Sequence, residues 1–244
     1  MTQPQPSDAT GERRDEIAAH LAEVRERIAL ACADAGRAVD EITMIAITKT
    51  RPASDVQLLG ELGVTDIGEN RDQEAAAKAA ECERLGVTGL TWHFVGQLQT
   101  NKAASVVRYA DVVHSVDRGR LVRALGTQAR RSGRRITCLI QVSLDGDPER
   151  GGAVAEQVPG LADAVAAEDG LVLGGVMAVA PLGVAVDAAF GRLAGIAADV
   201  RAAHPGATIV SAGMSADLED AIAAGATHLR VGTALLGARR TLVG

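Results

Sequence analysis

Three short segments of the chain combine residue types that could bind a ligand covalently and hold a phosphate. Lys49 ends an apolar, β-branched run in Ala46-Ile-Thr-Lys-Thr-Arg-Pro52. An apolar setting favours the neutral lysine amine, the form that condenses with a carbonyl group to give a Schiff base. Two later apolar runs lead into Ser211-Ala-Gly-Met-Ser215 and Arg230-Val-Gly-Thr233. Their glycines allow close approach of the backbone, and the hydroxyl groups that follow are donors for a phosphate.

Each of these residues also has a purely structural interpretation. Lys49 could lie on the surface just past the end of a strand, with its amine in water. Ser215 is a good helix N-cap, because Ala-Asp-Leu follows it. The combination is more specific than its parts. A nucleophilic lysine that faces a phosphate-binding loop selects a ligand with both an aldehyde and a phosphate group.

The elements that must position these residues alternate along the chain. A first helix is expected over about residues 15–35, and Gly36 is placed to end it. Short apolar runs predict eight strands, at residues 42–48, 65–68, 91–96, 112–116, 138–144, 173–180, 208–213 and 228–233. Helical stretches separate them, at residues 54–62, 71–85, 101–109, 118–131, 152–167, 184–203 and 215–224.

This alternation predicts an α/β fold, a single closed (β/α)8 barrel of the TIM type, with an open doubly wound sheet as the alternative. In a barrel, the loops after strands seven and eight share one face with the end of strand one, and phosphate sites are common there. At 244 residues the chain has the length of one such barrel. We expect a flexible tail at residues 1–12 and a single domain at residues 13–244.

The composition argues against several other classes of protein. The net charge is −6 with both signs interspersed, so the clustered basic face of a nucleic-acid-binding protein is not expected. No apolar run approaches the ~20 residues of a membrane span, and the N-terminus has no apolar signal core. The three cysteines lie far apart and form neither a metal-ligand pair nor a disulfide framework. A cytoplasmic protein without a metal site is therefore expected.

Several longer motifs carry a family resemblance. They are Ala46-Ile-Thr-Lys-Thr-Arg-Pro52, Gly68-Glu-Asn70 with Gln73-Glu74, Trp92-His-Phe-Val-Gly-Gln-Leu-Gln-Thr-Asn-Lys102, Gly175-Val-Met-Ala178, Gly213-Met-Ser215, and Arg230-Val-Gly-Thr-Ala234 with Gly237-Ala-Arg239. Together they resemble the YggS/PROSC family of pyridoxal 5′-phosphate (PLP) homeostasis proteins, over residues 42–239. The resemblance implies the barrel of the alanine racemase N-terminal domain, the fold type III of PLP proteins, with an extra N-terminal helix.

The resemblance also implies roles for single residues. Lys49 would carry PLP as a Schiff base, Arg230 would face the pyridine nitrogen, and Asn70 would lie close to the cofactor. Ser215, Gly232 and Thr233 would hold the phosphate, with Ser211 and Met214 nearby. His93 is expected to pack or to hydrogen-bond behind the site, and His228 to be structural.

The sequence departs from the family pattern at several positions. The family usually has Tyr at Arg71 and Pro at Gln97, has Phe at Leu236, and often has Met at Ala212 and Lys-Ser-Gly at Arg150-Gly-Gly152. These departures leave open the contacts at the edge of the cofactor and a second PLP or anion site. They do not touch Lys49 or the phosphate loops.

The family implies a carrier that holds PLP for storage or for delivery to PLP-dependent apo-enzymes. An arginine is a poor proton donor to the ring nitrogen. Racemases of the related fold take a base from the tyrosine of a second, C-terminal domain across a dimer. Here the chain ends at Gly244, soon after the last strand, and its one tyrosine is Tyr109. We therefore expect a monomer without catalysis. A low-activity PLP enzyme acting on amino acids and a cofactor-free Schiff-base aldolase acting on a sugar phosphate remain alternatives.

Overall fold

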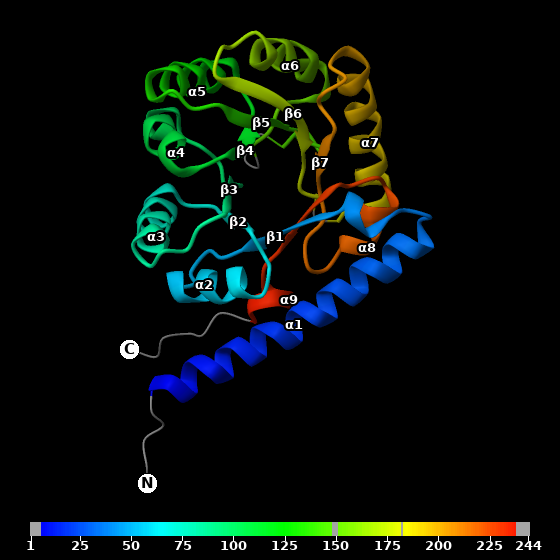
Figure 1. Ribbon diagram of the computed structural model, residues 1–244. Helices are drawn as coiled ribbons and strands as arrows, with labels where there is room; N and C mark the ends of the chain where they lie inside the picture. The colour runs from blue at the N-terminus through cyan, green and yellow to red at the C-terminus, as the bar shows by residue number, and fades with distance from the viewer. Residues whose placement is uncertain (1–5, 148–150, 182, 238–244) are drawn as a thin grey trace.

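A closed barrel of eight parallel strands forms the centre of the computed structural model, which describes residues 6–147, 151–181 and 183–237 (Figure 1). The strands are β1 (Thr43–Ile47), β2 (Asp66–Glu69), β3 (Thr91–Phe94), β4 (Val112–Val116), β5 (Ile136–Gln141), β6 (Leu171–Met177), β7 (Ile209–Ser211) and β8 (His228–Val231). Each strand pairs with the next, and β8 closes on β1 through the register Ile45 to Arg230. The predicted barrel is confirmed, and the open sheet is wrong.

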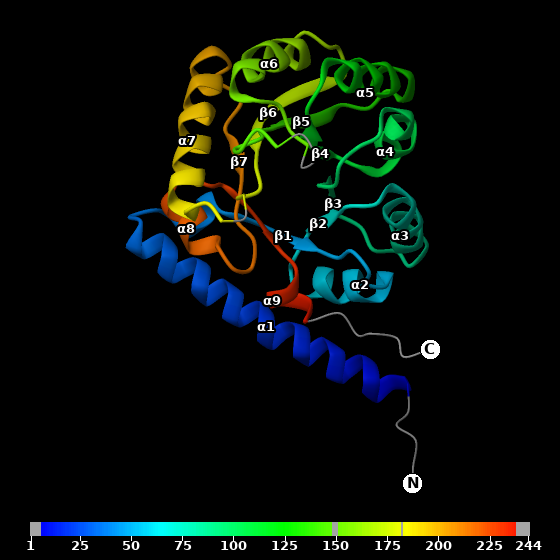
Figure 2. The ribbon, with the colours of Figure 1, turned by 180° about the vertical axis from the view of Figure 1, so that it is seen from behind.

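Helices surround the barrel (Figure 2). They are α1 (Pro6–Asp34), α2 (Ala53–Glu61), α3 (Asp72–Arg84), α4 (Ala103–Tyr109), α5 (Gly119–Ser132), α6 (Val158–Ala166), α7 (Val186–Ala203), α8 (Leu218–Ala223) and α9 (Thr233–Leu236), with short 3-10 turns at η1 (Val39–Glu41), η2 (Thr100–Lys102) and η3 (Ala155–Gln157). No helix among these is both long and apolar enough to cross a membrane.

The first helix lies across the outside of the barrel, alongside α8 and α9 (Figures 1 and 2). Its buried stripe includes Ile17, Leu21 and Val24, at the three- and four-residue spacing of an apolar helix face. Arg27 forms an ion pair of 2.8 Å with Glu219 in α8. The extra N-terminal helix therefore braces the last units of the barrel, which carry two of the predicted site loops.

Two expected boundaries need correction. The first helix begins at Pro6 and not near residue 15, so residues 6–12 of the expected tail are helical; residues 1–5 lie outside the described residues. Helix α8 begins at Leu218, so Ser215 is not its N-cap. Asp217 takes the cap position, and its carboxylate accepts a hydrogen bond of 2.6 Å from the Met214 backbone N–H. The carboxylate thereby folds residues 214–217 into a turn before the helix starts.

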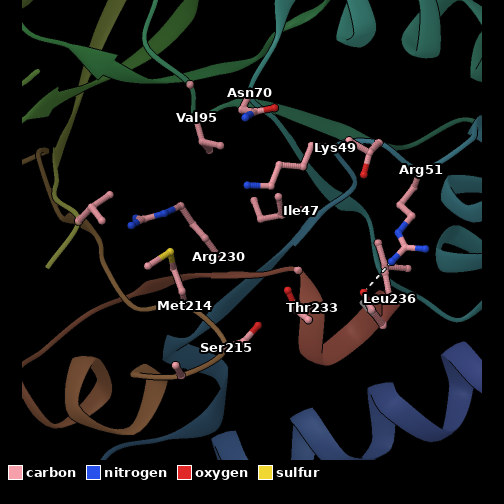
Figure 3. Close-up of a pocket in the computed structure, with 16 residues that line it drawn as sticks. Ile47, Lys49, Arg51, Asn70, Val95, Met214, Ser215, Arg230, Thr233 and Leu236 are labelled. Carbon is pink, nitrogen blue, oxygen red and sulfur yellow. Dashed lines mark hydrogen bonds between the residues drawn. The ribbon is translucent and has the colours of Figure 1, made fainter. Parts of the chain in front are cut away.

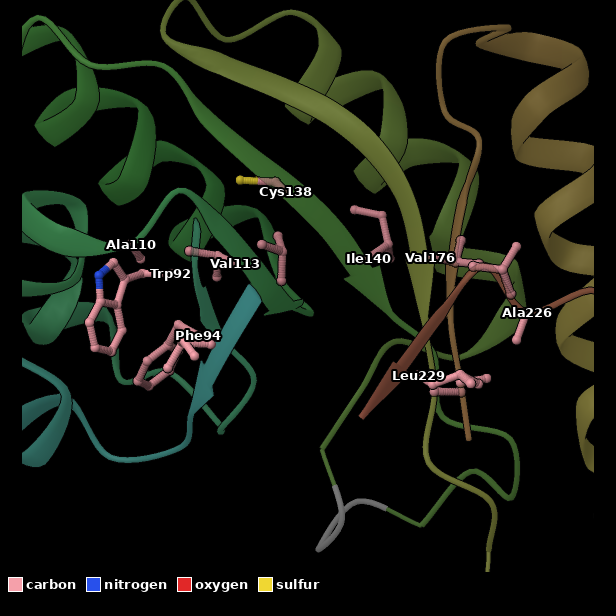
Figure 4. Packing of buried hydrophobic residues seen from close by; sticks show 14 of the residues in the cluster. Trp92, Phe94, Ala110, Val113, Cys138, Ile140, Val176, Ala226 and Leu229 are labelled. Atoms are coloured by element: carbon pink, nitrogen blue, oxygen red, sulfur yellow. The ribbon is translucent and has the colours of Figure 1, made fainter. Parts of the chain in front are cut away.

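Alternation along the strands divides the core into two layers. Side chains such as Phe94, Ile140 and Leu229 belong to the large apolar cluster between the strands and the helices (Figure 4). Val112, Leu139 and Met177 form a separate cluster, with Ile209 packed against it. The two histidines His93 and His114, whose rings contact each other, are fully or almost fully buried as well. The inner layer is therefore partly polar, whereas barrels usually fill this space with branched aliphatic side chains.

Candidate functional site

A cavity of about 480 Å³ lies at the ends of β1 and β8, on the face where the strands finish (Figure 3). Seven of the eight residues proposed from the sequence line it: Lys49, Asn70, Met214, Ser215, Arg230, Gly232 and Thr233. Ser211 does not line it. This residue is fully buried and contacts the Arg230 guanidinium from beneath. The fold thus gathers loops from opposite ends of the chain into one site.

Lys49 points into this cavity from a tight turn at the end of β1 (Figure 3). The Arg51 N–H donates to the Thr48 carbonyl at 3.0 Å and closes the turn. Thr50 has a φ of 65°, and among the described residues it is the one non-glycine in the left-handed region. Such backbone strain clusters at functional sites. Lys49 is exposed, so the burial expected from its place on an apolar strand is wrong.

A buried ion cluster, formed by Lys78, Glu69 and Glu74, stabilises this turn. Lys78 on α3 is 6 % exposed, and its amine donates to the Thr48 carbonyl at 2.7 Å. The same amine pairs with Glu69, and with Glu74 at 3.3 Å. Glu74 in turn accepts a hydrogen bond from the Thr50 backbone N–H. The strained conformation that presents Lys49 is therefore stabilised by several charge-assisted contacts.

The role of Lys78 was missed in the sequence. The signal that could have found it is its place on the buried stripe of α3, three residues after Ala75 and four before Cys82. Glu69 ends β2 and is fully buried, bonded to Lys78 and to the Thr48 hydroxyl, at 2.6 Å for the latter. Burial raises the pKa of Glu69, and these two partners oppose that effect. Glu69 is therefore held in the buried cluster with Lys78 and Thr48.

The chain has three lysines, and one of them faces the cavity. Lys78 is held in the ion cluster just described. Lys102 lies on η2, where its amine is 3.9 Å from Asp72. Lys49 is therefore the amine that a ligand in the cavity can reach.

Arg230 forms the floor of the cavity and is 5 % exposed. Its Nη1 donates to the Ser211 hydroxyl at 2.7 Å, and its Nη2 donates to the Ala178 carbonyl at 2.8 Å. Burial lowers the pKa of Arg230 to about 10, so the guanidinium still carries its charge at neutral pH. Both protein partners are neutral, and no ion pair to Arg230 is present within the described part of the chain. A buried cation of this kind favours a ligand that supplies an acceptor.

The loops after β7 and β8 meet at the opposite side of the cavity. The Ser215 hydroxyl accepts a hydrogen bond of 3.2 Å from the Ala234 backbone N–H, which joins the two loops. Gly213 has a φ of 86°, and a Cβ there would lie 2.6 Å from the Ala221 Cβ. Gly232 packs against Ile47, which a Cβ would approach to 3.4 Å. The two glycines therefore let these loops pack closely against α8, β8 and β1.

Most of the described departures from the family pattern lie outside the lining of this cavity. Leu236 lines the cavity, whereas Ala212 is buried and Arg71 and Gln97 are exposed. Arg150 lies outside the described residues. Over residues 6–147, 151–181 and 183–237, no group of three His, Cys, Asp or Glu side chains is placed to hold a metal ion. The three cysteines are buried and unpaired.

His93 lies behind the site, and its ring is hydrogen-bonded to one histidine ring and one carboxylate, as the sequence indicated. Its Nδ1 is 2.9 Å from His114 Nε2, and its Nε2 is 3.0 Å from the Asp66 carboxylate. His228 lies nearby, with its ring centroid 6.4 Å from that of His93. Burial, and then the neighbouring His93, lowers the pKa of His228 to about 4. Burial also lowers the pKa of His114 well below the ordinary value.

The lowered pKa values of His114 and His228 predict that acid destabilises the fold. Between about pH 6.5 and pH 4, the unfolded chain binds protons on rings that stay neutral in the folded barrel, so the free energy of unfolding falls as the pH falls. For His228 alone, the loss between pH 7 and pH 5 is about 2 kcal/mol. Urea unfolding of the wild type and of His228→Leu at both pH values checks this. The variant should lose less stability on acidification, and an equal loss in the two proteins would contradict the prediction.

The fold and the site define a class of protein that comparison with known proteins also finds. Residues 18–240 match the family described as Alanine racemase, N-terminal domain. The barrel of alanine racemase from Corynebacterium glutamicum has the same fold, with a TM-score of 0.66 and 15 % identity over 94 % of this chain and 64 % of that one. The chain is thus a barrel of the alanine racemase N-terminal type.

More similar proteins narrow this class. A "Pyridoxal phosphate homeostasis protein" of Mycobacterium bovis is 46 % identical over 94 % of this chain and 95 % of its own. The protein of that name from Escherichia coli is 39 % identical over 92 % and 97 %. The structure of PipY from Synechococcus elongatus, with PLP bound, is 34 % identical, with a TM-score of 0.77 over 91 % of this chain and 100 % of that one. The chain belongs to the family of pyridoxal phosphate homeostasis proteins.

Proposed function

We propose that this protein binds PLP reversibly, holds it as a Schiff base on Lys49, and stores it or delivers it to PLP-dependent apo-enzymes in the cytoplasm. One observation carries the proposal. A single cavity combines the lysine amine, a buried guanidinium and two loop hydroxyls beside closely packed glycines. These are partners for an aldehyde, a ring nitrogen and a phosphate. The buried, unpaired cysteines agree with a reducing compartment.

The residues fit PLP in both type and arrangement. The amine of Lys49 is free to condense with an aldehyde, with loss of one water molecule. Arg230 offers hydrogen bonds from a rigid, buried guanidinium to a ring nitrogen that has a lone pair. Ser215 and Thr233, with the backbone around Gly232, offer the donors that a phosphate requires.

The same residues make an efficient PLP enzyme the weaker interpretation. When bound, PLP supplies a reactive aldehyde and a ring that withdraws electrons. Arg230 would donate a hydrogen bond to the ring nitrogen but would keep its own proton, because the guanidinium pKa of about 10 is far above that of the ring. The chain therefore does not strengthen the withdrawal of electrons by protonating the ring.

Apart from Lys49, no side chain that could act as a second base for amino-acid chemistry lines the cavity within the described residues. Tyr109 does not line the cavity, and its hydroxyl is buried. Burial, followed by the charges of Asp72 and Glu69, raises the pKa of Tyr109 far above its usual range. Glu69 is bound in the Lys78 cluster. These observations favour a carrier over a racemase.

Titration with PLP tests the proposal. The purified protein should take up about one PLP per chain and develop the visible absorbance of a Schiff base. A protein that stays colourless and retains no PLP would overturn the proposal.

To separate carrier from enzyme, the loaded protein is incubated with single-enantiomer amino acids in deuterated water. No deuterium should appear at the α-carbon, and exchange at a catalytic rate would favour the enzyme.

A further inference from the structure

A chain of hydrogen bonds runs through the interior of the barrel, from the cavity to the opposite ends of the strands. Arg230 Nη1 lies 2.7 Å from the Ser211 hydroxyl, and the same hydroxyl lies 3.0 Å from His114 Nδ1. His114 Nε2 lies 2.9 Å from His93 Nδ1, and His93 Nε2 lies 3.0 Å from the Asp66 carboxylate. Asp66 opens β2, so the chain connects the cavity with the far end of the barrel.

This chain of hydrogen bonds is buried, and each of its polar atoms has a partner. Ser211 and His114 are fully buried, His93 is 2 % exposed, and the Asp66 side chain reaches solvent with 26 % exposure. No polar atom of these residues is among the buried side-chain atoms that lack a partner. A polar network in a barrel interior is costly unless every member is paired, and this one meets that condition.

Hydrogen-bond chemistry gives the chain a single direction. A guanidinium only donates, so Ser211 accepts from Arg230 and uses its own proton toward His114 Nδ1. His114 then carries its proton on Nε2 and donates to His93 Nδ1. His93 carries its proton on Nε2 and donates to Asp66, whose carboxylate only accepts. A cation and an anion at the two ends thus fix both tautomers.

The opposite direction fits less well. A doubly protonated His93 could donate to both Asp66 and His114, and His114 would then donate to Ser211. The Ser211 hydroxyl would receive two donors, and its proton would have no acceptor within the described residues. The hydrogen bond from His93 also favours a charged Asp66. Burial opposes that charge, but the hydrogen bond from His93 outweighs it and lowers the pKa of Asp66.

We propose that His114 and His93 are positioning residues for the PLP site. By keeping Ser211 an acceptor, they hold the Arg230 guanidinium in the orientation that meets the ring nitrogen of the cofactor. The affinity for PLP then depends on residues that do not line the cavity, as far away as Asp66. This inference rests on the proposed function, but its first test does not require PLP.

The first test is the protonation of the histidine rings in the protein without added PLP. Nitrogen-15 NMR at pH 7.5 distinguishes the two neutral tautomers and the charged ring, and loss of signals in His93→Gln and His114→Leu assigns them. Both rings should be neutral with the proton on Nε2. A charged His93, or a proton on Nδ1 of either ring, would overturn the proposed direction.

The second test is the dissociation constant of PLP in variants of the chain. Asp66→Ala, Ser211→Ala and His114→Leu should each weaken binding about fivefold, the effect of one neutral hydrogen bond. In an Arg230→Gln background these substitutions should have almost no further effect, because they act through Arg230. Asp66 is partly exposed, so Asp66→Ala keeps the test open if a core variant fails to fold.

His228→Leu is the matched control. His228 is a third interior histidine and lies close to His93, but its Nδ1 bonds to the Thr227 hydroxyl at 3.0 Å and its ring is not part of the chain of hydrogen bonds. The dissociation constant of PLP for His228→Leu should stay within twofold of the wild-type value. Equal losses in the control, or full additivity with Arg230→Gln, would show a general structural effect and overturn the inference. Absence of PLP binding to the wild type would instead refute the proposed function.

Discussion

Replacing Lys49 by alanine is expected to abolish the visible absorbance of the PLP-loaded protein. The amine that condenses with the aldehyde is lost, and no other lysine lines the cavity. The ring and phosphate contacts remain, so binding should persist in a weaker form. We expect the dissociation constant to rise at least about a hundredfold, which corresponds to about 2.8 kcal/mol. Absorbance titration and equilibrium dialysis measure the two effects separately.

Lys102→Ala is the control for this prediction. Lys102 is a partly exposed lysine outside the cavity, near Asp72, so its loss should change neither the spectrum nor the affinity. Thermal unfolding should show that Lys49→Ala is folded, because the Lys49 side chain is exposed and the turn is held by Lys78 and Glu74. Retention of the absorbance in Lys49→Ala would mean that another amine carries the cofactor.

The second large effect concerns the phosphate. The wild type should bind PLP at least about a hundredfold more tightly than pyridoxal, because charge-assisted hydrogen bonds contribute about 1.5–3 kcal/mol each. In the double variant Ser215→Ala with Thr233→Val this ratio should fall at least about tenfold. Competition titrations with the two ligands give the ratio directly.

Pyridoxal is the internal control for that experiment, since its affinity should change little in the double variant. Ser215 also joins the two loops through Ala234, so the melting temperature of the variant is needed to detect a displaced loop. An unchanged ratio of PLP to pyridoxal affinity would mean that the phosphate lies elsewhere. The Gly213 and Gly232 loops would then be close-packed for structural reasons alone.

The sequence could predict the barrel and most of the cavity because both follow from local patterns. Alternating apolar runs and helical stretches define the strands, and parallel strands place their ends on one face. Lys49, Asn70 and Gly232 each follow or end such a run, so their meeting in one cavity follows from the topology.

Other features depend on contacts that a single sequence does not display. Ser215 and Asp217 are both good caps, and the structure places Asp217 at the start of α8, where its carboxylate reaches the Met214 N–H. His114 and Ser211 meet across the barrel although 97 residues separate them. The exposure of Lys49 depends on the shape of the open cavity. Periodicity and motifs carry no information about such pairings.

In the polar interior of the barrel, two neutral acceptors, the Ser211 hydroxyl and the Ala178 carbonyl, hydrogen-bond the buried Arg230. An arginine on an apolar floor would lose its hydrogen bonds to Ser211 and Ala178 and would face a large desolvation penalty. With these neutral partners the guanidinium keeps its charge, and the part of the ligand that contacts it need not be anionic. This arrangement favours holding a cofactor over activating it for chemistry.

Reductive trapping tests the central claim most directly. The PLP-loaded protein is treated with sodium borohydride, which converts a Schiff base to a stable secondary amine, and is then digested and mapped by mass spectrometry. The account predicts one phosphopyridoxyl group, on the peptide that contains Lys49. A label on Lys78, on Lys102 or on the N-terminal amine, or bound PLP that leaves no label at all, would contradict it.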